Sequence, residues 1–344
     1  MKNIKLTVVT PVFNLIKNHR QDDFVRCLSS VHNQTYENIE YLIIDGASTD
    51  GTLEFLKPYE DKEWIKVYSE KDEGVYDAFN KGINKASGDY IMFLGSDDIL
   101  YSNNSAMYLM EAIEKTEADW AYGHTYYKKD ENLYFWQGTI KAIPFGSGPC
   151  HQSIIVSTAA MKRIGGFELN NAIADIDVMM KLIKYNYKSI FVDRIISIFS
   201  EGGWSTTEGF SLQRNDFVQS FYNILGKDRG LTLTDCQNLY AGKCYGILSP
   251  KELFSLGMKL RNYEWVTAFF NRDFIILRVN PKQPSEKKCT KKIKFLGVPL
   301  LKIYSDSKRK KISILGIRIV KIQYRHRKKK IYFMGIPTIT IKED

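Results

Sequence analysis

The sequence predicts an α/β fold in which helices cover both faces of a mostly parallel sheet. Strand-like and helix-like patterns alternate three times within the first 100 residues, which is the order expected for a doubly wound sheet. The strand segments are short and apolar, as in a sheet that is buried on both faces. The most apolar segment, residues 90–94, is followed closely by two adjacent carboxylates, Asp97 and Asp98. Ligands of such sheets bind at the carboxyl ends of the strands.

Hydrophobic spacing gives the expected elements of the first half of the chain. Strands are expected at 6–10, 39–44, 65–68 and 90–94, and helices at 23–32, 52–56 and 74–86. We expect the first strand to stop at Pro11, because proline has no amide hydrogen to donate to a central ladder.

The same reading continues to residue 280. Strands are expected at 119–122, 154–156, 189–192 and 195–199, helices at 104–115, 158–164 and 172–185, and an aromatic hairpin within 124–142. Helices are expected to fill 208–280, where Ser249, Pro250 and Glu252 form a capping box with proline at the first helical position.

Right-handed crossovers would bring the ends of the first, second and fourth strands to one edge of the sheet. Pro11, Phe13, Asn14 and Asp45 would then share a crevice with the carboxylate pair. No GxGxxG or GxxxxGK[ST] motif is present, which argues against a dinucleotide cofactor and against a P-loop. Two interpretations of the carboxylate pair stay open: a divalent metal site that clamps a diphosphate, or a solvated turn or helix cap before Ile99.

Composition limits the class of protein. The chain has 344 residues, a net charge of +10 and five cysteines without a CxxC pair. The cysteines are expected to be reduced thiols in a cytosolic protein rather than zinc ligands or a disulfide frame. Neither a signal peptide nor an apolar run of spanning length is apparent, so the expected location is cytoplasmic.

The positive charge belongs to the C-terminal tail. Residues 281–344 hold 19 Lys and Arg and four acids, a net charge of +15 that leaves −5 for residues 1–280. The tail also repeats itself, with Gly297, Gly316 and Gly335 at a step of 19 residues. Repeats of this kind bury their apolar faces only by stacking on one another, so we expect a small β appendage. An anionic membrane surface, a plain solvated β module and a dimer contact remain open as its role, and no nucleic acid is expected.

The expected organisation is therefore a catalytic domain over 1–205, a helical extension over 206–280 and the basic β-repeat tail over 281–344.

Five motifs occur in a fixed order: TPVFN at 10–14, DGASTDGT at 45–52, DEGVYDAFNKGI at 72–83, ASGDY at 86–90 and the pair Asp97-Asp98. Together they resemble the family 2 glycosyltransferases over roughly residues 4–205. The resemblance implies a GT-A fold, a Rossmann-like domain for nucleotide-diphospho-sugars, and transfer of a sugar from a nucleoside-diphosphate donor with inversion at the anomeric carbon.

The resemblance also implies roles for individual residues. Asp45 matches the acid that holds the nucleobase and ribose, and Asp97 and Asp98 match the DxD-type site for Mg²⁺ or Mn²⁺. Gly95 stands where the family usually has the first acid of that site. Asp175 matches the catalytic base, which takes the proton of the acceptor hydroxyl.

Two further departures from the family pattern lie beside that base. Ala174 replaces the usual glutamate before it, and Lys181 stands where an arginine is frequent. The QxxRW motif of processive synthases is absent, which favours a single addition.

Further candidate contacts lie in the same segments. The expected donor contacts are Pro11, Phe13, Asn14, Asp45, Ser48, Asp72, Tyr76, Asp77, Asn80, Lys81 and Asp97. The expected acceptor contacts are His151, Gln152, Asp177 and Trp204. Plain structural roles stay open for several of them: helix capping for Asp175 and Asp177, a satisfied structural histidine for His151, a core position for Trp204, and helix-start positions for Tyr76 and Asp77.

The predicted function is metal-dependent hexosyl or N-acetylhexosaminyl transfer from a UDP-sugar to a glycan or polyprenyl-linked acceptor in surface polysaccharide biosynthesis. The chain would act in the cytoplasm, and its tail would hold it on the inner membrane face. One alternative is a non-catalytic protein whose basic tail binds a membrane, a nucleic acid or a partner. A nucleotidyltransferase is a third reading, but no glycine-rich activation loop follows the first strand.

Overall fold

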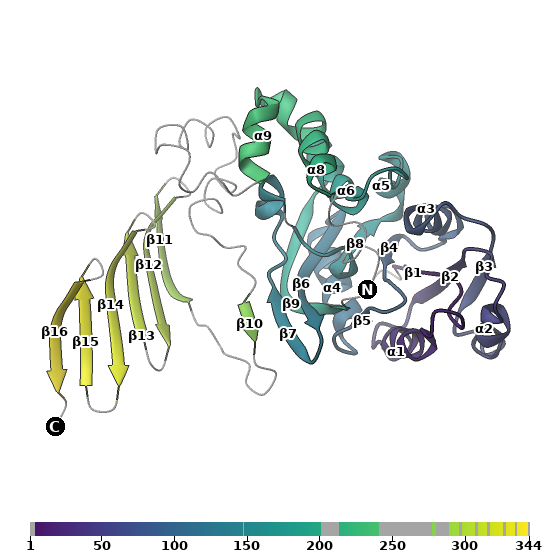
Figure 1. The fold of residues 1–344 in the computed structure, drawn as a ribbon, viewed down its shortest axis with the longest axis horizontal. Helices are drawn as coiled ribbons and strands as arrows, with labels where there is room; N and C mark the ends of the chain where they lie inside the picture. The colour runs from purple at the N-terminus through teal and green to yellow at the C-terminus, as the bar shows by residue number, and fades with distance from the viewer. Residues whose placement is uncertain are drawn as a thin grey trace. The chain divides into compact units, whose positions relative to one another are not determined.

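The computed structural model describes residues 4–146, 148–200, 213–240 and 277–279, together with six strands between residues 289 and 342 (Figure 1). The chain forms two compact units. One comprises Met1–Ser249 with Phe274–Arg278, and the other comprises Pro250–Asp273 with Val279–Asp344.

A parallel sheet forms the centre of the first unit, as predicted. β1 (Leu6–Val12) pairs with β2 (Ile39–Asp45) on one side and with β4 (Tyr90–Phe93) on the other, and β2 pairs with β3 (Lys66–Ser69). All three pairings are parallel. The three strand–helix–strand connections therefore confirm the α/β class and place the ends of β1, β2 and β4 at one edge.

Helices cover both faces of this sheet. They are α1 (Gln21–His32), α2 (Thr52–Glu60), α3 (Val75–Lys85), α4 (Ser105–Thr116), α5 (Thr158–Arg163) and α6 (Ala174–Lys184). Figure 1 shows α1 and α2 on one side of the strands and α3, α5 and α6 on the other. Apolar side chains of α1, α2 and α4 share one core cluster with alternate residues of β1 and β2, which is the pattern of strands buried on both faces.

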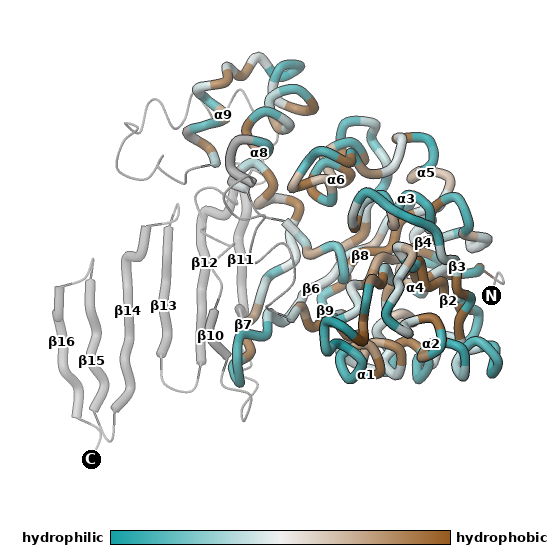
Figure 2. The backbone as a smooth tube through the Cα atoms, turned by 45° about the vertical axis from the view of Figure 1, so that its right-hand side comes forward, coloured by the Kyte–Doolittle hydropathy of each residue, from teal (hydrophilic) through white to brown (hydrophobic). Residues whose placement is uncertain are grey.

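The opposite face of the sheet contacts α3 closely. A Cβ added to Gly82 would lie 2.4 Å from a methyl carbon of Val9, so only glycine lets the helix approach β1 this far. Phe79 of the same helix packs on Phe93 of β4 with ring centroids 4.8 Å apart. Figure 2 shows hydrophobic residues concentrated along these central strands and hydrophilic residues along the outer turns.

The prediction that the first strand ends at Pro11 is wrong, because β1 continues to Val12. Val12 still accepts a hydrogen bond from the Gly46 amide, on the β2 side. The backbone of Pro11, like that of Val9, is directed towards the β4 side of β1. The ladder between β1 and β4 stops at Val9. The missing amide hydrogen of Pro11 therefore faces a position that β4 no longer occupies.

The second half of the first unit adds antiparallel strands to the sheet. These are β8 (Ile154–Ser157), β6 (Trp120–Lys129) and β7 (Asn132–Trp136), and the described strands follow the order β10-β7-β6-β8-β4-β1-β2-β3. The β6–β7 pair is the predicted hairpin. The two strands expected within 189–199 are one strand, β9 (Ser189–Ser200), which pairs with β6 and with β5 (Ile99–Leu100).

The helical region beyond residue 212 is described in part. α8 (Gln213–Phe221) continues into a π-helical turn, Tyr222–Gly226, and α9 (Leu233–Tyr240) follows. The expectation of helix throughout 208–280 is wrong at Leu277–Val279, which forms strand β10. The predicted capping box at Ser249 lies outside the described residues. None of the described helices has the length and apolar character needed to span a membrane.

The tail forms an antiparallel meander in which each of six described strands pairs with the next. The strands are β11 (Cys289–Phe295), β12 (Val298–Asp306), β13 (Arg309–Ile314), β14 (Ile317–Arg325), β15 (Lys328–Phe333) and β16 (Ile336–Lys342). The register repeats with the sequence: Ile293 pairs with Leu301, Ile312 with Val320 and Ile331 with Ile339. The 19-residue repeat is thus a repeating β-hairpin, and the three repeat glycines fall in connections outside the described residues.

Candidate functional site

The end of β2 places a fully buried carboxylate, Asp45, at the ligand-binding edge of the sheet. Its oxygens accept hydrogen bonds from the Ser48 amide at 3.0 Å, from the Ser48 hydroxyl and from the Ser69 hydroxyl at 2.6 Å. These donors fix the carboxylate from two neighbouring strand ends.

The loops after β1 and β2 are tied to each other through side-chain hydrogen bonds. The Asn14 amide donates to the Ser48 hydroxyl at 2.7 Å, and the Asn14 side chain accepts from the Thr49 amide at 3.1 Å. Asp50 accepts from the Lys17 amide at 2.7 Å. Asn14 has φ 49°, a left-handed conformation that asparagine tolerates better than most residues. The motif residues therefore build one rigid rim.

Phe13 and Asp72 both approach Gly46 at this rim. A Cβ on Gly46 would lie 2.6 Å from Asp72 Oδ2 and 3.2 Å from the Phe13 ring. Phe13 is 56% exposed, so its ring is available to a ligand. Burial raises the pKa of Asp72, against the lowering effect of the Gly74 amide and Lys81. The three motifs that carry these residues thus meet at one place.

The first two turns of α3 hold four of the predicted donor contacts: Tyr76, Asp77, Asn80 and Lys81. Asp77 accepts from the Glu73 amide at 3.0 Å and pairs with Lys81 at 3.3 Å. Asn80 bonds both backbone groups of Phe167, donating to its carbonyl at 2.8 Å and accepting from its amide at 2.9 Å. These two hydrogen bonds use both polar atoms of the Asn80 side chain to hold the segment before α6.

The end of β4 carries Asp97, and the loop after β1 contributes a cation to it. Arg20 Nη1 lies 2.9 Å from Asp97 Oδ2, and the Asp97 side chain is 17% exposed. The sequence interpretation did not include Arg20. Its position in the loop after the first strand, at the same edge as the acids, was the available signal.

Asp98, the second acid after β4, is buried rather than solvated, with 2% exposure. Its Oδ2 accepts from Gln152 Nε2 at 2.8 Å, and its Oδ1 accepts from the Ser200 amide at 3.0 Å. Burial and the adjacent Asp97 carboxylate raise the pKa of Asp98 to about 7, although His151, Ser200 and Gln152 act in the opposite direction. The open interpretation of a solvated turn or helix cap therefore fails for Asp98: a strand, β5, follows it.

The two carboxylates converge over Gly95. A Cβ on Gly95 would lie 2.6 Å from Asp98 Oδ2 and 3.0 Å from Asp97 Oδ1. The described residues include no group of three acids, histidines or cysteines that would enclose a metal by themselves. Mg²⁺ typically takes one or two carboxylates and completes its shell with waters and substrate phosphates. The donor set of Asp97 and Asp98 fits a cation shared with a diphosphate.

The N-terminal turn of α6 brings Asp175 to two aromatic side chains. Asp175 Oδ2 lies 3.3 Å from His151 Nδ1, and Asp175 Oδ1 accepts from the Tyr76 hydroxyl at 3.4 Å. Burial raises the pKa of Tyr76 well above its usual value, and the Asp175 charge raises it further, so Tyr76 stays a neutral donor. His151 and Gln152 are consecutive, so one short segment connects Asp175 with Asp98.

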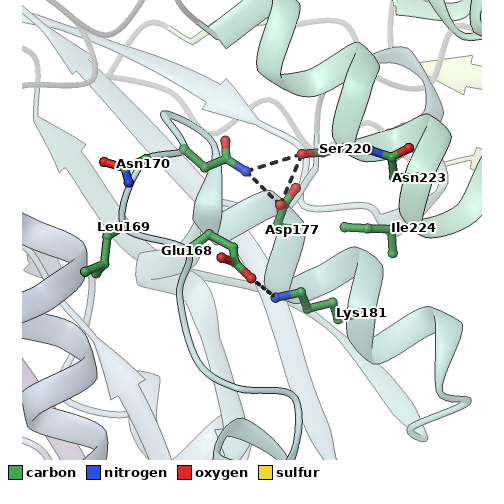
Figure 3. Close-up of a pocket in the computed structure, with 9 residues that line it drawn as sticks. Glu168, Leu169, Asn170, Asp177, Lys181, Ser220, Asn223 and Ile224 are labelled. Carbon is green, nitrogen blue, oxygen red and sulfur yellow. Dashed lines mark hydrogen bonds and ion pairs between the residues drawn. The ribbon is translucent and has the colours of Figure 1, made fainter.

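Asp177, two residues further along α6, lies in a separate polar cluster. Its Oδ2 accepts from Asn171 Nδ2 at 2.7 Å and from the Ser220 hydroxyl at 3.1 Å (Figure 3). Ser220 belongs to α8 and was not among the predicted site residues, because no sequence motif marks that helix. Trp204, the remaining predicted acceptor contact, lies outside the described residues.

Comparison with known proteins gives a family match and a shared fold. Residues 7–174 match the family model described as glycosyl transferase family 2. The chain is 31% identical over 157 residues to a PGL/p-HBAD biosynthesis glycosyltransferase of Mycobacterium bovis, a match covering 44% of this chain and 60% of the relative. It is 30% identical over 184 residues to glycosyltransferase GlyG of Streptococcus pneumoniae, covering 52% and 56% of the two chains. The matches thus span a little over half the length of these relatives.

Two solved structures share the fold at low sequence identity. TarS of S. aureus, residues 1–349 in complex with UDP-GlcNAc, has a TM-score of 0.53 at 18% identity and covers 78% of this chain and 80% of its own. Mannosyltransferase PcManGT of Pyrobaculum calidifontis, in complex with GDP-Man and Mn²⁺, has a TM-score of 0.51 at 13% identity, covering 77% and 84%. Residues 7–174 therefore match the family 2 glycosyltransferases, and the solved structures show that the chain shares the GT-A fold.

Proposed function

We propose that the chain is an inverting, metal-dependent glycosyltransferase that moves a single sugar from a nucleoside-diphosphate sugar to a hydroxyl of a glycan or lipid-linked acceptor. The observation that carries this proposal is the connection between Asp98 and Asp175. Gln152 donates to Asp98, and the preceding residue, His151, lies 3.3 Å from Asp175. A donor-side acid and an acceptor-side acid are thereby held on either side of one short segment.

The donor would lie across the rim formed by the loops after β1 and β2. Asp45, fixed by Ser48 and Ser69, has acceptor oxygens suited to ribose or nucleobase donors, and the exposed Phe13 ring offers a surface for a base to stack on. Asp97 and Asp98 would hold Mg²⁺ or Mn²⁺, which supplies Lewis-acid stabilisation of the charge on the leaving diphosphate. Arg20, at 2.9 Å from Asp97, adds positive charge to the same place.

The acceptor side would depend on Asp175. An inverting displacement needs one carboxylate that takes the proton of the attacking hydroxyl, and no covalent intermediate. The Tyr76 hydroxyl and His151 hold the two oxygens of Asp175 from different elements, which fixes the direction of the carboxylate. We assign Gln152 to positioning Asp98 rather than to the acceptor, because its side chain is 2% exposed and bonded to that acid.

The relatives support the donor class. TarS was solved with UDP-GlcNAc and with UDP, and PcManGT with GDP-Man and Mn²⁺. The relatives named as biosynthetic glycosyltransferases support a role in making a surface glycan or glycolipid. A UDP-sugar is our first choice of donor.

The donor part of the proposal is tested by isothermal calorimetry of UDP and GDP with the wild type, with and without Mn²⁺, and with Asp45→Ala. We expect Mn²⁺ to strengthen the binding of one nucleotide at least tenfold, equivalent to about 1.4 kcal/mol, and Asp45→Ala to weaken it. Absence of binding of either nucleotide in the presence of Mn²⁺ would contradict the proposal.

We also propose that the basic tail holds the protein on an anionic membrane. Its net charge of +15 over residues 281–344 is the supporting observation, since a Lys or Arg near such a surface contributes about 1 kcal/mol. The full chain should co-sediment with phosphatidylserine vesicles and not with neutral phosphatidylcholine vesicles. Equal partitioning onto both would contradict this role.

A further inference from the structure

A pocket of about 530 Å³, lined mostly by polar residues, lies beside α6. Its lining includes neither Asp175 nor any residue of the donor rim, and Figure 3 shows the side chains that form its wall. Its volume falls within the range of small-molecule sites. The lining residues come from the segment before α6, from α6 itself, from α8 and from the π-helical turn: Glu168, Leu169, Asn170, Asn171, Asp177, Lys181, Ser220, Asn223 and Ile224.

The inner wall of the pocket is a built hydrogen-bonding cluster. Asp177 is 4% exposed, and its Oδ2 holds Asn171 at 2.7 Å and Ser220 at 3.1 Å. Its Oδ1 is buried and has no hydrogen-bond partner among the described residues. A buried polar atom without a partner destabilises the folded state. Such a cost is one that proteins tend to retain where a ligand or a function requires it.

The charges of the wall decide which ligands suit it. The Lys181 ammonium lies 2.9 Å from the Glu168 carboxylate, so its charge is already balanced. Burial raises the pKa of Asp177 to about 7, so near neutral pH this acid exists in part as a neutral carboxyl that both donates and accepts. Amides, a hydroxyl and carboxyl groups without an unbalanced cation suit a neutral, hydroxyl-rich ligand better than an anion.

The pocket is joined to the site of Asp175 by two consecutive residues. Asn171 lines the pocket, and the carbonyl of the next residue, Ala172, accepts from the Tyr76 hydroxyl at 3.5 Å. Tyr76 in turn contacts Asp175. Asp175 and Asp177 also share the first turn of α6. A chain of sugars that presents one hydroxyl to Asp175 therefore has a polar recess next to it for a neighbouring unit.

We propose that the pocket lined by Asn171, Asp177 and Ser220 binds a neutral sugar unit of the acceptor other than the unit that receives the transferred sugar. This inference rests on the proposed function, since it takes the acceptor to be a glycan. Asp177 is an expected acceptor contact, and the inference assigns it to a subsite that α6 and α8 form together.

The test uses the full chain and two matched substitutions. Asn170 is exposed at the rim of the pocket, so Asn170→Trp would fill the recess without removing a member of the Asp177 cluster. Asn103→Trp makes the same change at an exposed loop position before α4 and serves as the control. The probes are the methyl glycosides of glucose, galactose, mannose, rhamnose and N-acetylglucosamine. Their binding is measured by saturation-transfer difference NMR. UDP binding with Mn²⁺ is measured on every variant.

We expect at least one glycoside to bind the wild type and Asn103→Trp, and to bind Asn170→Trp about tenfold or more weakly, with UDP binding unchanged throughout. Three outcomes would overturn the inference while UDP still binds: no glycoside binds the wild type, Asn170→Trp binds it equally well, or both tryptophan variants lose it equally. If a UDP-sugar loses affinity in Asn170→Trp while UDP does not, the pocket holds the donor sugar instead. Failure of UDP to bind the wild type would instead count against the proposed function.

Discussion

His151 Nδ1 lies 3.3 Å from Asp175 Oδ2, while the side chain of the next residue, Gln152, donates to Asp98 at 2.8 Å. The two consecutive side chains thus point to the two acids that the proposed reaction needs. They come from the short 3₁₀ turn His151–Ser153 that precedes β8. Any shift of this turn would therefore disturb both acids together.

Loss of the histidine contact should lower turnover without removing the donor site. We expect His151→Ala to reduce kcat by about tenfold or more, because Asp175 Oδ2 loses its contact with the imidazole ring. His151→Gln, which keeps a donor, should recover part of the loss. The measurement is kcat and donor KM for the three proteins. A rise in donor KM with unchanged kcat would contradict a positioning role.

Gln152 should increase the affinity of the site for Mn²⁺. Gln152→Leu leaves one oxygen of the buried Asp98 without its donor, and outer partners of metal ligands are typically worth 10–100-fold in metal affinity. We expect the Mn²⁺ concentration for half-maximal donor turnover to rise by about that factor. Gln219→Leu, at an exposed position of α8, is the control. An unchanged Mn²⁺ requirement in Gln152→Leu would show that Asp98 does not hold the metal.

A third prediction concerns the sheet. Burial alone would raise the pKa of Glu40, but hydrogen bonds from Ser87, Lys66 and Thr7 lower it to about 2. A depressed pKa gives stability that is present above about pH 4.5 and is lost as pH falls towards 2. Glu40→Gln should therefore lower the free energy of unfolding at pH 7 by on the order of 3 kcal/mol.

The difference between Glu40→Gln and the wild type should vanish near pH 2. Urea unfolding across this range measures it, and Glu37→Gln, at an exposed position just before the same strand, is the matched control. A destabilisation of Glu40→Gln that does not change between pH 2 and 5 would point to lost packing instead of the ionised hydrogen bonds.

Asp177 should make the folding stability depend on pH in the opposite direction to Glu40. Its pKa is raised by burial from 3.8 to about 7, so the unfolded chain releases this proton at lower pH than the folded protein does. The folded state then loses stability as pH rises from about 4 to 7. Asp177→Asn keeps an acceptor for Asn171 and Ser220 and removes the titration. Its stability relative to the wild type should increase over that range in urea titrations; a constant difference would contradict the buried-acid assignment.

Much of the site could be predicted from the sequence because short motifs follow strand ends. Asp45, Asp97 and Asp98 follow β2 and β4, and parallel topology fixes where those ends meet. The Asp72 motif also reaches this edge, since it precedes α3. Periodicity and turn residues therefore suffice for this half of the molecule.

The remaining parts depend on contacts that no local pattern records. Arg20 lies in a polar loop and pairs with Asp97, 77 residues away. The π-helical turn after Phe221 and the Ser220 contact with Asp177 arise from how α8 packs on α6. The predicted break within 189–199 failed because Asp193 and Arg194 look like a turn, whereas pairing with β6 keeps the strand continuous through a register shift. Tertiary context overrides propensity at such places.

The most direct test of the central claim is release of nucleoside diphosphate from a panel of UDP- and GDP-sugars with Mn²⁺, for wild type, Asp97→Ala and Asp175→Asn. Asp130→Asn, in the exposed β6–β7 turn, is the control. We predict metal-dependent release from one donor by wild type and control, loss of it in Asp97→Ala, and about 10²–10⁴-fold slower transfer with intact donor binding in Asp175→Asn. Full activity of Asp175→Asn, or release that is indifferent to Asp97→Ala, would contradict the proposed reaction.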